Sequence, residues 1–132
     1  MQSEKFTALV RNAIGAAQSA ALAADHQKLT AEHVLAALLK DDNMTVKMLL
    51  AKAGADSASL SALLKAGLDK FPQVTGSGAG QLQLDADLAR ILAAVEAEAK
   101  ARHDQFIAVD LLLLGMTKST GSVGKILKKA GV

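Results

Sequence analysis

The side chains best suited to metal or acid–base chemistry are three histidines, His26, His33 and His103. Glu32 directly precedes His33, as in half of a zinc-binding helix, but such a helix needs a second histidine four residues away, and the sequence has none there. The chain has no cysteine. We therefore expect no metal site, and the positions of His26 and His103 near predicted helix ends suit a cation that the helix dipole favours.

Two other kinds of catalytic site lack their motifs. There is no Gly-x-x-x-x-Gly-Lys-Ser/Thr loop to hold a nucleotide phosphate, and no Gly-x-Ser-x-Gly turn to present a nucleophile. We therefore expect no catalytic residue and no cofactor-binding residue in this chain.

The charges are balanced and dispersed. Fifteen basic and 13 acidic residues give a net charge of +2. Only four lysines, at 118, 125, 128 and 129, form any cluster, and cations suit a helix C-terminus. Without a basic stripe or a recognition helix we expect no nucleic-acid binding. The longest apolar runs are too short to cross a bilayer, and the N-terminus lacks a signal-peptide pattern, so we expect a cytoplasmic protein that does not bind membranes.

The composition favours helices. Apolar residues make up 51% of the chain but aromatic residues only 2%, and there is one proline. The core must therefore consist of Ala, Leu, Ile and Val, which suits closely packed helices better than a β-sandwich.

Seven segments carry apolar residues at helical spacing. Thr30, Asp56 or Ser57, and Asp85 are predicted to cap helices at their N-termini, and Gly54 stands where a left-handed C-cap residue belongs. Residues 72–83 have no helical period and contain three glycines in five residues, which predicts a flexible connector.

The helical pattern repeats. Residues 27–32 align with 105–110 at an offset of 78, and residues 46–54 align with 123–131 at an offset of 77. The first and fifth helices keep the offset of 78. We therefore predict an all-α single domain over 1–132 that consists of a tandem repeat in a pseudo-two-fold bundle, with repeat one over 1–71, a connector over 72–83 and repeat two over 84–132.

These features resemble a known family. The tandem repeat, the Glu-His-Val-Leu-Ala-Ala-Leu-Leu run of residues 32–39 and the Phe-Pro-Gln-Val step at 71–74 before the glycine-rich segment are similar to the N-terminal domain of Clp ATPases. Within that family, the 71–74 step and Gln-Phe-Ile at 105–107 most resemble the ClpB-type disaggregases.

The resemblance implies a binding module without catalysis of its own. In that family the domain stands before a hexameric ATPase ring, where ATP is bound, captures unfolded or aggregated polypeptides and passes them to the ring. Adaptor proteins are further partners that the family implies. A protease-linked Clp unfoldase is the alternative, with Glu32 and Asp110 docking adaptors or phosphoarginine-marked clients.

The resemblance also implies a set of substrate-binding residues: Thr7, Leu92, Asp104, Phe106, Asp110 and Leu111. An apolar groove would bind exposed core residues of clients, and carboxylates at its rim would favour basic segments. Asp110 replaces the usual Glu. Thr7 and Asp110 also fit helix capping, and Leu92 and Leu111 also fit core packing, so both interpretations stay open. Phe106 aligns with the polar Lys28, which predicts partial exposure.

Overall fold

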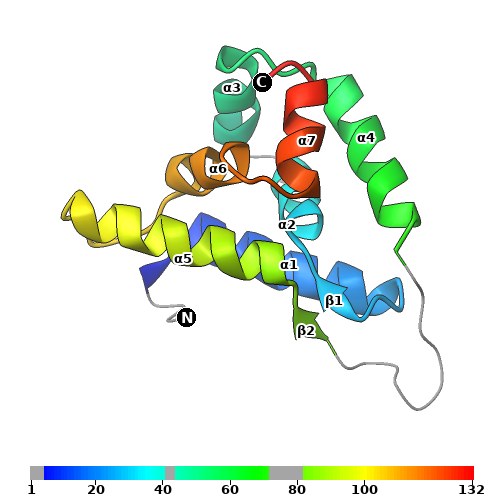
Figure 1. The fold of residues 1–132 in the computed structure, drawn as a ribbon, viewed down its shortest axis with the longest axis horizontal. Helices are drawn as coiled ribbons and strands as arrows, with labels where there is room; N and C mark the ends of the chain where they lie inside the picture. Colours follow the sequence, from blue (N-terminus) through cyan, green and yellow to red (C-terminus); the bar gives the residue numbers. More distant parts are fainter. Residues whose placement is uncertain (1–4, 41–43, 72–81) are drawn as a thin grey trace.

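The computed structural model describes residues 5–40, 44–71 and 82–132, in which the chain forms seven α-helices and two short strands (Figure 1). This confirms the predicted all-α fold. Two-residue strands were not predicted, because they are too short to give a period. The elements are α1 (Ala8–Ala23), β1 (Lys28–Leu29), α2 (Ala31–Lys40), α3 (Met44–Lys52), α4 (Ser57–Asp69), β2 (Gln83–Leu84), α5 (Ala86–Ala101), α6 (Val109–Thr117) and α7 (Ser122–Lys129).

Helices α1, α2, α4 and α5 begin at side chains that accept hydrogen bonds from their own first turn. Thr30 Oγ1 accepts from the amide of the third residue after it, and Asp56 and Asp85 accept from amides in the first turns of α4 and α5. These contacts confirm the three predicted N-caps. Thr7 caps α1 in the same way. Each cap satisfies a backbone donor that the helix itself leaves unpaired.

Backbone geometry repeats at the predicted offsets. Gly54 and Gly131 have φ of 96° and 108°, at an offset of 77, which confirms the prediction for Gly54. Asp25 and His103 have φ of 59° and 60°, at an offset of 78. A left-handed residue thus follows α1 and α5, and a left-handed glycine follows α3 and α7.

The two halves exchange their short extended segments. Leu29 pairs with Leu84 in the parallel β1–β2 sheet, and Phe6 pairs with Ile107 in an isolated bridge. The amide of Asp85 donates to the Leu29 carbonyl at 2.9 Å, and the amide of Thr7 donates to the Ile107 carbonyl at 3.0 Å. Both pairs are related by an offset of 78, so they support the predicted pseudo-two-fold arrangement. The predicted connector lies mostly outside the described residues, and its last residue, Gln83, belongs to β2.

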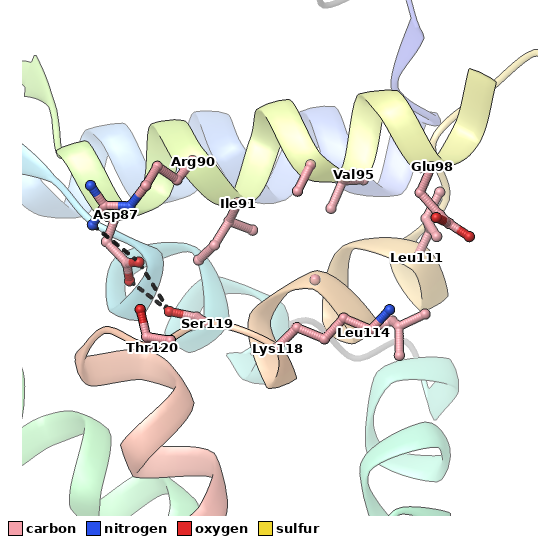
Figure 2. A pocket seen from close by; sticks show the side chains of 12 residues that line it. Asp87, Arg90, Ile91, Val95, Glu98, Leu111, Leu114, Lys118, Ser119 and Thr120 are labelled. Atoms are coloured by element: carbon pink, nitrogen blue, oxygen red, sulfur yellow. Dashed lines mark hydrogen bonds and ion pairs between the residues drawn. The ribbon is translucent and has the colours of Figure 1, made fainter. Parts of the chain in front are cut away.

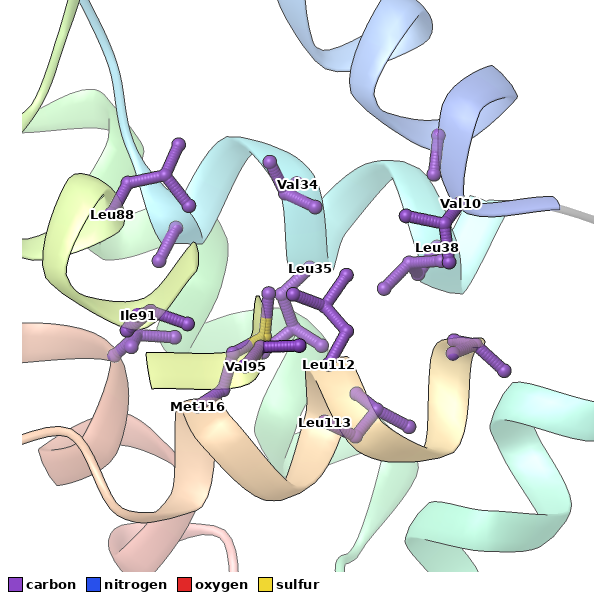
Figure 3. Close-up of a cluster of buried hydrophobic side chains, with 14 of the residues drawn as sticks. Val10, Val34, Leu35, Leu38, Leu88, Ile91, Val95, Leu112, Leu113 and Met116 are labelled. Carbon is purple, nitrogen blue, oxygen red and sulfur yellow. The ribbon is translucent and has the colours of Figure 1, made fainter. Parts of the chain in front are cut away.

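The core is aliphatic, as predicted. Leu35, Leu38, Leu112 and Met116 are fully buried where α2 and α6 meet (Figure 3). Phe6 is the buried aromatic residue of the described chain. No helix in residues 5–40, 44–71 or 82–132 is long and apolar enough to cross a membrane.

Candidate functional site

A groove lies between α5 and α6 (Figure 2). Its volume is about 310 Å³. Ile91 and Val95 of α5 and Leu111 and Gly115 of α6 form its apolar floor, and we call this site the α5–α6 groove. A volume of this size is at the small end for ligand sites in proteins and suits one or two bulky apolar side chains.

Gly115 permits the close approach of the two helices that wall the groove. A Cβ atom at this position would lie 2.5 Å from Val95 Cγ2 and 3.4 Å from Ile91 Cγ2. No side chain therefore fits at this position unless α5 and α6 move apart or Val95 changes rotamer.

We expect Gly115→Ala to lower the free energy of unfolding by about 1–3 kcal/mol, because overpacking outweighs the better helix propensity of Ala. Urea unfolding followed by circular dichroism measures this effect. The matched control is Gly15→Ala in α1, where nothing lies within 4 Å of the added Cβ. Equal stability gains in both variants would show that Gly115 is not needed for helix contact.

The rim of the groove carries both signs of charge. The Ser119 hydroxyl donates to the Asp87 carboxylate, whose two oxygens both lie 3.0 Å from it, and Asp87 lies 3.8 Å from Arg90. Glu98 pairs with Arg102 at 2.9 Å. The remaining charged rim residue, Lys118, makes no ion pair in the described part of the chain. Figure 2 shows the Lys118 side chain extending beside Leu114. The rim is thus mostly neutralised, which leaves apolar burial as the main source of binding energy.

The structure separates the sequence-predicted site residues. Leu111 lies in the groove floor, whereas Leu92 is buried in the core and does not line the groove. Asp110 is exposed near the beginning of α6 and lines a different hollow, between α3 and α6.

Thr7 lies close to the segment before α6. Its amide bonds to Ile107, next to the exposed residues Asp104 and Phe106. Phe106 is 56% exposed, which confirms the predicted partial exposure. Whether these residues bind a client stays a prediction.

Most groove residues were missed by the sequence reasoning. Ile91 and Val95 were interpreted only as a core face, and both are indeed buried, with 3% and 2% of their surface exposed. The signal that could have found the groove is Gly115, because a glycine inside an apolar helix costs about 1 kcal/mol relative to Ala and marks a close approach.

Glu32 is not available as a docking carboxylate. It is 3% exposed, and its carboxylate accepts a 2.8 Å hydrogen bond from the Ser122 hydroxyl. Burial raises the pKa of Glu32 above its usual value. A charged ligand would have to break into the core to reach it, so a paired Glu32–Asp110 docking site is not favoured by this arrangement.

The structure places His26 beside His33, a pairing that the sequence did not predict. His26 and His33 are both buried, and His26 Nδ1 lies 2.8 Å from His33 Nε2. The amide of Thr30 donates to His33 Nδ1 at 3.1 Å, so the proton of His33 is on Nε2 and points to His26. Both rings pack on Phe71 with centroids 5.5 Å away. Among the residues described, no three potential metal ligands lie together.

Comparison with known proteins defines the family. The model of the Clp repeat (R) N-terminal domain matches residues 5–130. The chaperone protein ClpB of Rhizobium meliloti is 40% identical over 133 residues, and that of Vibrio cholerae is 33% identical over 132 residues. Each alignment covers 100% of this chain and 15% of the relative, so the chain spans about one-seventh of the length of these relatives.

Solved structures share the fold. The Hsp104 N-terminal domain from Candida albicans has a TM-score of 0.82 at 21% identity and covers 96% of this chain and 81% of its own. The N-terminal domain of the ClpV1 ATPase from E. coli has a TM-score of 0.77 at 20% identity and covers 95% and 83%. The repeat at offsets of 77 and 78, the exchanged segments and the match over residues 5–130 lead to one conclusion: the chain belongs to the Clp N-terminal domain family.

Proposed function

We propose that this chain is the substrate-recognition domain of a ClpB-type disaggregase and that the α5–α6 groove binds exposed apolar side chains of unfolded or aggregated polypeptides. The observation that carries the proposal is the apolar floor of Ile91, Val95 and Leu111 beneath a rim whose acidic groups already have partners. Such a surface gives non-directional affinity, which suits many different clients.

The rest of the proposal concerns the longer protein. The domain hands clients to a hexameric ATPase ring in the cytoplasm, has no catalysis and binds no cofactor itself. The ClpB relatives, of which this domain forms 15%, support this assignment. Burial of Glu32 disfavours the protease-linked alternative, in which that residue would contact adaptors or phosphoarginine.

Ala94→Arg tests the groove. Ala94 is exposed and lines the groove, so an arginine there would fill the opening without disturbing the core. We expect the wild-type chain to bind a permanently unfolded, apolar-rich protein in the micromolar range or weaker, because the groove is much smaller than a standard interface. We expect the variant to bind it about tenfold more weakly in a fluorescence anisotropy titration.

Ala93→Arg is the matched control, since Ala93 is exposed on the same helix but does not line the groove. Circular dichroism must show that both variants stay folded. If Ala94→Arg binds as well as wild type, the client site lies elsewhere. Thr7→Ala and Asp110→Asn then test the neighbouring surface, and ATP turnover by the pure chain would contradict a binding-only role.

A further inference from the structure

The first repeat has an apolar hollow of its own, between α2 and α4. These two helices pack together, and α4 also packs against α7 (Figure 1). We call this site the α2–α4 hollow. Its volume is about 400 Å³, compared with about 310 Å³ for the α5–α6 groove, and the two sites share no lining residue. A volume of this size lies within the range of small-molecule sites in proteins.

A small side chain in α2 keeps the hollow open. Ala36 lines it, and the offset of 78 relates Ala36 to Leu114, so a methyl group stands where the second repeat has a larger side chain. Leu64 is 2% exposed and forms the floor, and the partly buried Leu39 and Leu68 complete the apolar lining. The inside of the hollow is therefore aliphatic.

The mouth of the hollow carries more positive than negative charge. Lys40 of α2 and Lys65 of α4 are exposed there, and neither makes an ion pair with a residue that the structure describes. Asp69 is the acidic lining residue. Ser61 stands one turn before Lys65, so a hydroxyl donor and an ammonium group lie on the same side of α4. The mouth thus complements an anion.

The lining offers little to a polypeptide backbone. The walls are helices, and apart from those at the helix ends their amide and carbonyl groups bond to one another. A peptide that entered the hollow would bury amide groups without partners, which costs binding free energy. An aliphatic chain has no such groups, so it suits the hollow better.

We propose that the α2–α4 hollow binds an aliphatic monocarboxylate. Its hydrocarbon chain packs on Leu39, Leu64 and Leu68, and its carboxylate accepts hydrogen bonds from the Ser61 hydroxyl and the Lys65 ammonium group, which are charge-assisted contacts. The carboxylate lies at this end because α2 and α4 both end near the other charged residues, and a helix C-terminus repels anions. This site is separate from the proposed client groove and needs no client.

Calorimetric titration of the chain with sodium octanoate tests the site. We expect one molecule to bind per chain. The affinity should rise about fourfold for each CH₂ group added between hexanoate and octanoate, because each one leaves water for the apolar lining. Octyltrimethylammonium has the same hydrocarbon chain with a cationic head, and it should bind about two- to fivefold more weakly than octanoate.

A bulky side chain at the mouth should block the ligand. Ser61→Trp places an indole ring in the opening, and we expect it to abolish octanoate binding. Ala62→Trp is the matched control, since Ala62 is exposed on the same helix and does not line the hollow. Circular dichroism must show that both variants stay folded. If Ser61→Trp binds octanoate like wild type, the ligand does not enter the α2–α4 hollow and the proposal is wrong.

Charge variants locate the carboxylate. Lys65→Gln should weaken octanoate binding about two- to fivefold, whereas Asp69→Asn should strengthen it slightly, because a like charge is removed. Lys70→Gln is the matched control at an exposed position that does not line the hollow. The affinity for octyltrimethylammonium should change in the opposite direction in Lys65→Gln and Asp69→Asn. Equal affinities for octanoate in all three variants would contradict the assigned carboxylate position.

Two further results would overturn the proposal. If many octanoate molecules bind per chain and lower the midpoint of thermal unfolding, octanoate acts only as a surfactant on the unfolded chain. If a Ser/Gly peptide that ends in Leu-Leu with a free carboxylate binds more tightly than octanoate, the ligand is a polypeptide C-terminus. Ala94→Arg, which tests the client groove, should bind octanoate like wild type, so failure of the proposed function and failure of this site are distinguishable.

Discussion

Replacing Gly131 by Ala should lower the free energy of unfolding by about 3–5 kcal/mol. Two effects combine in this value. The residue has φ of 108°, which strains an L-amino acid by about 1–3 kcal/mol, and the new Cβ would lie 2.5 Å from the carbonyl oxygen of Gly54, where overpacking adds about 1–3 kcal/mol. Thermal unfolding followed by circular dichroism should show a midpoint lower by about 10 °C or more.

The clash is mutual, which provides an internal check. A Cβ at Gly54 would lie 2.8 Å from the carbonyl oxygen of Gly131, so each glycine makes room for the other. The double variant should therefore lose less than the sum of the two single losses, because one backbone shift relieves both contacts. Gly15→Ala should instead raise stability by about 0.5–1 kcal/mol. Strictly additive losses would mean that strain at each φ, and not the contact between the halves, sets the effect.

Acid should destabilise the fold through the buried histidine pair. Burial, and then the charge of His26, lower the pKa of His33 to about 4 from 6.5. The unfolded chain therefore takes up this proton first, so stability is complete above pH 6.5 and falls as the pH drops from 6.5 towards 4. A shift of this size corresponds to about 2 kcal/mol between pH 7.5 and 5. Urea unfolding at several pH values measures the loss.

A proton on His33 Nδ1 can be donated to the Thr30 hydroxyl oxygen 2.8 Å away, but it also faces the Thr30 amide at 3.1 Å, so the acid form loses the hydrogen bond from that amide. His33→Gln should be less stable at pH 7.5 but should depend less on pH between 7.5 and 5. His103→Asn is the control, because His103 is exposed and Asn tolerates its φ of 60°. Glu32, whose pKa is raised by burial, acts in the opposite direction, and it does so in every variant. If the free energy of unfolding of His33→Gln changes with pH as much as that of the wild-type chain, the histidine pair is not the cause.

Local signals in the sequence were enough to predict the helices. Thr30, Asp56 and Asp85 cap helices because short polar side chains satisfy the first amides, and Gly54 ends α3 because it can adopt a left-handed conformation. These preferences act over a few residues, so a single sequence reveals them. The pairing of Leu84 with Leu29 and of Phe6 with Ile107 depends on contacts between residues about 55 and about 100 positions apart, and no local pattern encodes it.

The groove was harder to predict because its floor and the core share the same residue types. Leu92 and Leu111 both follow the apolar period of their helices, yet only Leu111 reaches the groove. Whether an apolar side chain lines a surface depression or lies in the core depends on its position within one helical turn. Periodicity alone does not resolve that difference. The contact between His26 and His33 was missed for a similar reason, since it depends on the conformation of the turn between them.

The contacts between the halves have the form of an interface between identical subunits. Leu29 with Leu84 mirrors Ile107 with Phe6, and Gly54 faces Gly131, so each half gives the other the same surface that it receives. This is the isologous contact of a two-fold symmetric homodimer. A half-length ancestor could thus have formed this interface as a dimer, and gene duplication with fusion would then have needed no new contact. Once fused, each copy can change separately, and the α5–α6 groove lies within the second copy.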